Sequence, residues 1–238
     1  MEDQHIKKGL NFPWLMQMAW RDSRKNKSRL FLFISSIILG IAVLVAIYSL
    51  GDNLKENIDL QAAEILGADL EISSGRPFSP EMKKLVDSLG DRRSDEQSFA
   101  SMIYFKKSGS SRLVQIRALQ GEFPYYGKLE TVPIEAGKNF RLKQEALVDQ
   151  SLMMQFNAQV GDSIKVGEVV FVIAGKLLKA PGQTGLTASV APSVFIPMQF
   201  LKQTGLSQKG SRINYRSYLK YDNRVNMPQV VKAIEPRL

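Results

Sequence analysis

Few side chains in this sequence are suited to catalysis. The single histidine is His5, and the chain has no cysteine. A Ser-His-Asp triad beyond the N-terminal arm, a cysteine nucleophile, a zinc–thiolate site and a histidine-rich metal site are therefore excluded. Glu145, Asp149 and Asp162 are carboxylates that could meet in space and exchange protons. We interpret them instead as solvated loop or turn residues, because each lies beside turn-forming sequence.

Nucleotide chemistry also lacks a motif. The chain contains no G-x-x-x-x-G-K-[ST] phosphate loop, and the glycines at 175–176 and 182–185 lack its spacing. Residues 161–162 and Gly167 are typical of turns, and the methionines and phenylalanine within 153–156 are interpreted as core. We therefore predict no catalytic, cofactor-binding or metal-ligating residue, and nothing in the sequence points to an enzyme.

The distribution of charge argues against nucleic-acid binding. The net charge is +9, and residues 1–29 carry seven lysines and arginines against three acidic residues. Residues 51–238 carry 25 against 20, scattered along the chain without a dense basic patch among aromatics. Nucleic-acid-binding surfaces concentrate their basic residues, so nucleic acid is not an expected partner. The same region, about 190 residues, is long enough for one well-buried domain.

One segment has the length and composition of a membrane span. Leu30 to Leu50 contains 21 residues without a charge, and a helix of that length is about 31 Å long, close to the thickness of the hydrocarbon layer. A cleaved signal peptide is the alternative, since Ser49-Leu50-Gly51 loosely resembles a small-x-small cleavage site. The stretch is longer than the usual apolar region of a signal peptide and begins late, so we expect a true span.

The flanks of this segment predict its orientation. Five basic residues lie between Arg21 and Arg29, whereas Lys55 is the single basic residue in the twenty positions after the span. The positive-inside rule places residues 1–29 in the cytoplasm as an arm and residues 51–238 outside. Within the arm, residues 12–20 (FPWLMQMAW) include two tryptophans and are expected to form an interfacial helix.

The remaining sequence predicts a mixed α+β domain. Leu54, Ile58, Ala62 and Ile65 recur at helical spacing, so a stalk helix is expected over 51–67, with Gly67 as its C-cap. The domain itself is expected over 68–238. Strands are expected at 68–73, 99–107, 112–119, 146–149, 163–166, 169–173, 193–196 and 213–221, and helices at 79–89, near 153–156, at 197–205 and at 228–234. The short strands around Gly167 indicate a small, barrel-like β-rich insert.

Taken in order, several stretches resemble the permease subunits of FtsX/MacB-type ABC transporters, in particular the YbbP-like branch. The first span and its basic approach are similar over 20–54. The stalk entering the first strand (QAAEILGADLEIS), a loop typical of the branch (IRALQGEFPYYGKLE) and the small β lobe (VGDSIKVGEVVFVIAGKL) follow. Residues 195–221 (FIPMQFLKQTGLSQKGSRINYRSYLKY) resemble the later helix and strand.

The resemblance implies a function as well as a fold. It implies a porter-like α/β domain with a β insert outside a bacterial inner membrane, moved by ATP hydrolysis in a separate cytoplasmic ATPase subunit. Hydrophobic or lipid-linked substrates exported or extracted at the outer leaflet are a common theme of the family. The implied partners are that ATPase, the lipid bilayer, and a second permease copy or the remainder of the permease. No cofactor is implied.

The sequence departs from the family in its number of spans. Such permeases have several, whereas one is found here, so we expect the chain to be the N-terminal part of a permease whose outer domain is incomplete at the C-terminus. A single-span anchored envelope protein that binds or scaffolds is the alternative, and an anchored hydrolase is a third. Further spans encoded in frame, next to a gene for an ATPase with a phosphate loop, would favour the permease.

Overall fold

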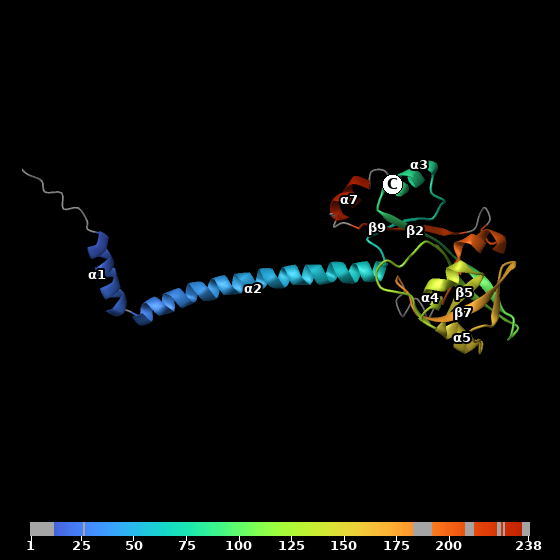
Figure 1. The fold of residues 1–238 in the computed structure, drawn as a ribbon, viewed down its shortest axis with the longest axis horizontal. Helices are drawn as coiled ribbons and strands as arrows, with labels where there is room; N and C mark the ends of the chain where they lie inside the picture. The colour runs from blue at the N-terminus through green and yellow to red at the C-terminus, as the bar shows by residue number, and fades with distance from the viewer. Residues whose placement is uncertain are drawn as a thin grey trace, which may run out of the picture. The chain divides into compact units, whose positions relative to one another are not determined.

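The computed structural model describes residues 12–25, 27–182, 192–207, 212–222, 225 and 227–234. The chain divides into two compact units, residues 1–58 and 59–238, which are described separately. Figure 1 shows the elements of both. His5 lies outside the described residues.

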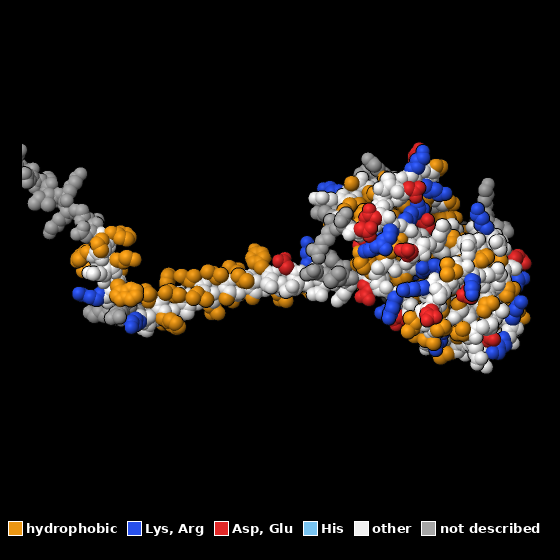
Figure 2. Space-filling model, in the orientation of Figure 1, with side chains coloured by type: hydrophobic (Ala, Val, Ile, Leu, Met, Phe, Trp, Pro, Cys, Tyr) orange, Lys and Arg blue, Asp and Glu red, His pale blue; other side chains and the backbone are white. Residues whose placement is uncertain are grey.

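The first unit is helical. Helix α1 (Phe12–Lys25) exposes Trp14 and Trp20, and helix α2 (Lys27–Leu66) begins after residue 26 and continues into the second unit. Within Lys27–Lys55 of α2, the most apolar 18-residue window has a mean hydropathy of 3.0, and none of that window is buried inside the protein. Figure 2 shows hydrophobic side chains along this helix. A helix that is apolar and exposed on every side fits a lipid environment, although a signal sequence satisfies the same length and composition.

Residues 51–66 continue helix α2, as the helical spacing predicts, and their role as a stalk stays a prediction. Helix α2 runs without interruption to Leu66, and the Gly67 N–H donates to the carbonyl of Ala63 at 2.7 Å. Gly67 has a φ of +75°, a left-handed conformation that ends the helix and that glycine adopts without steric cost.

The second unit is built on one sheet of nine strands with the order β1-β9-β2-β3-β8-β5-β7-β4, and β6 pairs with β2 and β7. The strands are β1 (Leu70–Ser74), β2 (Arg92–Phe105), β3 (Ser110–Gln120), β4 (Glu130–Val132), β5 (Glu145–Asp149), β6 (Ser163–Val166), β7 (Val169–Lys179), β8 (Ser193–Pro197) and β9 (Asn214–Lys220). The short helices are α3 (Pro80–Ser88), α4 (Ala136–Asn139), α5 (Gln150–Gln155) and α7 (Met227–Ile234), with 3-10 turns η1 (Phe140–Leu142) and η2 (Met198–Thr204).

Six strands close into a barrel. The pairings run β2–β3–β8–β5–β7–β6 and return to β2, where Ile103, Tyr104 and Phe105 face β6. Alternate side chains of β7 point inward, and Ile103, Ile116, Phe171 and Ile173 are among the buried residues that fill the interior. The β-rich insert predicted from the short strands around Gly167 is therefore present. Strands β2, β3 and β8, which lie outside that part of the sequence, complete the wall of the barrel.

The other end of the sheet is open. Strand β9 pairs with the first half of β2, from Arg92 to Ser98, and β1 pairs with the other edge of β9. Helix α3 packs on these strands through Val86, which joins Ile72 and Leu219 in a small core. The helix begins as the sequence predicts: Ser79 Oγ accepts from the Met82 N–H at 3.1 Å, and Pro80 occupies the first turn. The mixed α/β fold with a long N-terminal apolar helix is thus confirmed.

Some elements differ from expectation. Strand β2 begins at Arg92, seven residues earlier than predicted, because the sequence RRSDEQS places polar Ser94, Glu96 and Ser98 on the buried face. No apolar alternation marks such a strand. Strand β7 extends to Lys179. The elements β4, α4 and η1 lie in a stretch for which the sequence predicted no structure.

Candidate functional site at the end of the stalk helix

Backbone hydrogen bonds fix the end of α2 and the residues that directly follow it. The carbonyl of Gly67 accepts from the Tyr125 N–H at 2.8 Å and the carbonyl of Ile65 accepts from the Gly182 N–H at 2.8 Å, while the Asp69 N–H donates to Leu219 at 3.1 Å. We call residues 65–69 together with the loop 121–127 the stalk junction. The partners are distant in sequence, so the helix end is fixed to the body of the second unit.

Close packing also requires glycine at position 67. A Cβ there would lie 2.8 Å from Cε2 of Phe123 and 3.1 Å from Cβ of Pro124. The Phe123 ring has no room to withdraw, because it is fully buried and stacks on Tyr218 with ring centroids 3.9 Å apart. The loop and the helix end therefore approach as closely as a missing side chain allows.

Asp69 gathers polar groups around the first residues after the stalk. Its carboxylate accepts from the Tyr126 hydroxyl at 2.6 Å and from the Tyr221 N–H at 2.8 Å. Lys220 Nζ donates to the Tyr126 hydroxyl at 2.7 Å and lies 4.0 Å from the carboxylate of Asp69. This arrangement ties the loop, the stalk and the end of β9 together.

Ser94 fixes the other side of the loop. Its buried Oγ accepts from the Phe123 N–H at 3.0 Å and shares a hydrogen bond with the Tyr125 hydroxyl at 2.8 Å. Burial raises the pKa of Tyr125, and the hydrogen bond to Ser94 opposes that rise in part. Because Ser94 belongs to β2, the loop is attached to the strand shared by the barrel and the open sheet.

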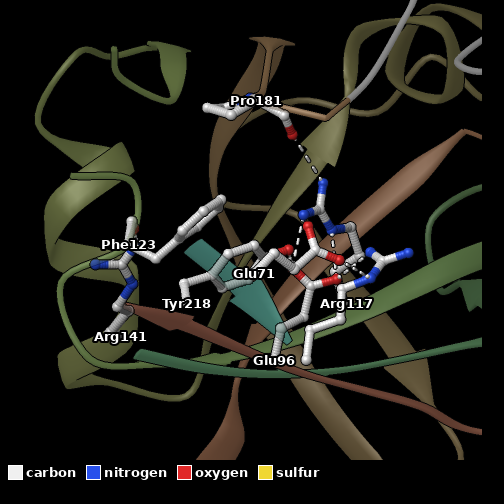
Figure 3. Close-up of polar contacts among 8 residues, drawn as sticks. Glu71, Glu96, Arg117, Phe123, Arg141, Pro181 and Tyr218 are labelled. Carbon is white, nitrogen blue, oxygen red and sulfur yellow. Dashed lines mark hydrogen bonds and ion pairs between the residues drawn. The ribbon is translucent and has the colours of Figure 1, made fainter. Parts of the chain in front are cut away.

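A buried ion pair lies beneath the junction (Figure 3). Arg117 Nε and Nη2 donate to Glu96 Oε1 and Oε2 at 2.9 and 2.6 Å, and the side chains are 7% and 0% exposed. Glu96 also accepts from the Tyr218 hydroxyl and from Arg216 Nη1, each at 3.2 Å. Arg117 Nη1 donates to the carbonyl of Pro181 at 3.4 Å.

The electrostatics of this group follow from burial and from Glu96. Burial opposes the charge of Arg117, but attraction and hydrogen bonding to Glu96 outweigh it and raise the Arg117 pKa. Burial, followed by the negative charge of Glu96, raises the pKa of the Tyr218 hydroxyl. Burial also raises the pKa of Glu71, against the attraction of Arg216. A paired, hydrogen-bonded charge network of this kind resists rearrangement.

The contacts therefore connect the stalk to both halves of the sheet. Tyr218 stacks on Phe123 of the loop and donates to Glu96, which in turn pairs with Arg117. These packed and hydrogen-bonded groups form one connected set between the stalk junction and the barrel.

The three acidic residues considered from the sequence each lie in a different element or turn. Asp149 caps α5 by accepting from the Ser151 N–H at 2.8 Å, Asp162 accepts from the Gln159 N–H at 2.8 Å and pairs with Lys107, and Glu145 begins β5. Backbone and lysine hydrogen bonds lower the pKa of Asp162. Among the described residues no group of three or more His, Asp or Glu could hold a metal ion. That no residue is catalytic or cofactor-binding stays a prediction.

One interpretation of the core is wrong in part. Met153 is buried and Phe156 packs against the barrel core, but the side chain of Met154 is 66% exposed. The reason is the short length of α5, which turns a single face inward. The sequence reasoning also missed the Glu96–Arg117 pair. An arginine inside the apolar run Ile116–Leu119 is the signal that could have revealed it, since an arginine there needs a buried partner.

Comparison with known proteins defines the class. The chain belongs to the family of MacB-like periplasmic core domains, whose model matches residues 30–237. It is 26% identical over 200 residues to the uncharacterized ABC transporter permease YbbP of Escherichia coli (strain K12). That match covers 83% of this chain and 24% of YbbP, so the chain spans about a quarter of the length of this relative. The family resemblance drawn from the sequence is confirmed.

Two solved structures are among those to which this chain is similar. The periplasmic region of MacB from Actinobacillus actinomycetemcomitans is 13% identical with a TM-score of 0.38, covering 65% of this chain and 70% of that one. A domain of a putative permease from Porphyromonas gingivalis is 12% identical with a TM-score of 0.41, covering 70% and 82%.

Proposed function

We propose that this chain serves as part of a permease subunit of an ABC transporter. In this proposal α2 crosses a bacterial inner membrane with its N-terminus in the cytoplasm, and residues 51–238 lie outside. A separate ATPase subunit hydrolyses ATP, and α2 and the stalk junction carry the resulting movement to the barrel and the open sheet. The substrate would be hydrophobic or lipid-linked, and the partners would include a second permease copy or the remainder of the permease.

The observation that carries the proposal is the attachment of the stalk end. A passive anchor needs no rigid joint to its domain, whereas a helix that transmits movement must be joined rigidly to what it moves. Here α2 is continuous from Lys27 to Leu66, Gly182 donates to Ile65 in its last turn, and loop 121–127 donates to Gly67 directly after it. Similarity to YbbP and the absence of a phosphate loop from this sequence support a division of labour with an ATPase.

The test is movement of the outer domain on ATP hydrolysis. The full-length protein would carry a donor fluorophore on Ser108→Cys, at the exposed β2–β3 turn, and be reconstituted with its ATPase in vesicles that contain an acceptor lipid. We expect energy transfer to change when ATP is added. An ATPase whose phosphate-loop lysine is replaced provides the control. Unchanged transfer, together with failure of any ABC ATPase to co-purify, would favour an anchored binding or scaffold protein instead.

A further inference from the structure

A second feature of the domain is a cleft between η1, η2 and the end of β3. It has a volume of about 490 Å³, which lies within the usual range for small-molecule sites. The residues that line it include two cations and two amides: Leu119, Gln120, Arg141, Met198, Gln199 and Lys202. The described lining contains no acidic side chain.

Arg141 forms no ion pair with a carboxylate among the residues that the structure describes. Its Nη1 donates to the carbonyl of Gly121 at 3.0 Å, and Nη2 donates to the carbonyl of Phe123, as Figure 3 shows by the position of Arg141 beside that residue. Its Nε is buried and has no hydrogen-bond partner among the described residues. Burial lowers its pKa to about 10, and the charge of exposed Glu122 compensates weakly.

The contrast with Arg117 shows what Arg141 lacks. Arg117 is buried and Arg141 is half-buried, and Arg117 has the bidentate carboxylate of Glu96, which raises its pKa. A partly desolvated cation that lacks an ion-pair partner is less favourable than a paired one, and a bound anion would supply such a partner. The guanidinium also has N–H groups left over after its two carbonyl contacts, in the planar arrangement that suits phosphate or carboxylate oxygens.

Lys202 supplies a second positive charge to the lining of the cleft. It belongs to η2, its side chain is exposed, and it forms no ion pair within the part of the chain that the structure describes. Gln120 and Gln199 add amide groups to the lining, and Gln199 Nε2 already donates to the carbonyl of Arg141 at 3.2 Å. Leu119 and Met198 provide an apolar surface beside them. Two cations, two amides and an apolar wall match a ligand with an anionic group attached to an apolar part.

We propose that this cleft binds a phosphate group through Arg141 and Lys202. Arg141 also donates to the carbonyls of Gly121 and Phe123. A ligand bound to Arg141 would therefore lie next to loop 121–127 of the stalk junction. The site is independent of the coupling function proposed above and goes beyond it. Its test measures binding without any ATPase, so failure of one proposal is distinguishable from failure of the other.

The experiment is a calorimetric titration of the full chain in nanodiscs of phosphatidylcholine. The two probes are inorganic phosphate and dihexanoyl phosphatidic acid, which present the same group as a free ion or on a lipid. Saturable binding of both with similar affinity would identify a free anion as sufficient. Much tighter binding of the lipid would identify a lipid phosphate as the ligand. Absence of saturable binding of either probe at millimolar concentration would overturn the proposal.

Variants assign the binding to the cleft. Lys202→Gln removes a side chain with no structural contact in the described residues, and we expect affinity to fall about 10-fold, as for loss of one charged hydrogen bond. Arg141→Gln should have at least that effect, with an unchanged far-ultraviolet circular dichroism spectrum showing that the domain is folded. The matched control is Lys138→Gln, an exposed lysine on α4 outside the cleft. Affinity unaltered by Lys202→Gln would contradict the assignment.

Discussion

Glu96 and Arg117 form the most deeply buried of the ion pairs found among the described residues. Such a pair contributes little net stability when it is intact, because desolvation of both charges offsets their attraction. Removal of one partner is different, since the other charge then stays buried and uncompensated. The stability of the domain should therefore depend on keeping both residues or replacing both.

The first prediction follows from this asymmetry. Glu96→Gln should lower the free energy of unfolding by about 3–5 kcal/mol, whereas the double change Glu96→Leu with Arg117→Leu should lower it by less. Urea unfolding of the full chain in detergent, followed by near-ultraviolet circular dichroism, would measure both. Lys107→Gln, which breaks the more exposed pair with Asp162, is the control and should cost less than about 1 kcal/mol. Equal losses from Glu96→Gln and Lys107→Gln would refute the argument.

The second prediction concerns alkaline pH. Tyr218 has a raised pKa in the folded protein because of burial and the charge of Glu96, whereas in the unfolded chain it ionises near pH 10. Above that pH the unfolded chain has lost this proton and the folded protein keeps it, so the stability that Tyr218 provides is present below pH 10 and declines as the pH rises.

Comparison of variants isolates this contribution. Tyr218→Phe should reduce the loss of unfolding free energy between pH 9 and pH 11, because phenylalanine does not ionise. It should also lower the unfolding free energy by a constant amount at every pH, because the hydrogen bond to Glu96 is lost. The measurement is urea unfolding of both proteins at several pH values. Tyr104→Phe, at a partly exposed tyrosine with no such partner among the described contacts, is the control. Parallel pH profiles for the native chain and Tyr218→Phe would count against the prediction.

Single residues show where sequence reasoning has its limits. Gly67 as a helix end and Ser79 as a cap were predictable, because each depends on local backbone chemistry. The pairing of Glu96 with Arg117, 21 residues away, was not, because it requires knowledge of the register of β2 and β3. The cleft at Arg141 and Lys202 was equally hidden, since its walls come from three separate elements.

At the scale of elements, the proposed coupling of ATP hydrolysis to movement of the outer domain depends on the contact between the end of α2 and loop 121–127. The third prediction is that Gly67→Ala weakens it, because alanine disfavours a φ of +75° and its Cβ would lie 2.8 Å from Phe123. The left-handed conformation alone costs about 1–2 kcal/mol, so the total should exceed that figure. Hydrogen exchange at the Tyr125 amide, which donates to Gly67, should quicken more than exchange in the barrel strands.

Gly75→Ala is the matched control for this change. Gly75 lies between β1 and α3 in the same unit, and a Cβ there would meet nothing within 4 Å. We expect little change in unfolding free energy or in exchange at Tyr125. Loss of protection of similar size in Gly75→Ala and Gly67→Ala would show that the effect is not specific to the stalk junction.

Elements differed in how far the sequence predicted them. Strands β6 and β7 were recognisable from β-branched residues around a glycine turn, and α3 from its cap and proline. The first half of β2 was not, because its inward positions are Ser94, Glu96 and Ser98, whose burial depends on partners in other strands. Ser94 and Glu96 are hydrogen-bonded to residues of other segments, and those bonds exist in the folded sheet alone, whereas Ser98 Oγ is buried without a hydrogen-bond partner among the described residues.

For the molecule as a whole, closure of the barrel and attachment of the stalk are related. Strand β2 pairs with β9 in its first half and with β6 in its second, so a single strand belongs to the open sheet and to the barrel. The stalk end is hydrogen-bonded to loop 121–127, which Ser94 of β2 holds in place. A force applied at the stalk would therefore reach both halves of the unit through β2. The sequence indicated the two halves, but their common strand required the tertiary pairings.

The last prediction concerns topology, which the charged flanks suggest and the fold does not determine. The chain has no cysteine, so a single introduced thiol can be labelled without background. Ser108→Cys places one at the exposed β2–β3 turn, and Ser23→Cys places one in the basic approach to the span. If the arm is cytoplasmic, an impermeant maleimide added to intact spheroplasts should label the first variant and leave the second unlabelled until the cells are lysed.

The same two variants distinguish a span from a cleaved signal sequence. Cleavage near Leu50 would remove Ser23 from the mature chain, so a full-length labelled band of Ser23→Cys after lysis would exclude it, whereas a released and shortened Ser108→Cys product would establish it. Labelling of Ser23→Cys in intact spheroplasts would reverse the orientation. The proposed coupling would then fail as well, because an ATPase in the cytoplasm would face the folded domain rather than the arm, and α2 would have no movement to carry outward.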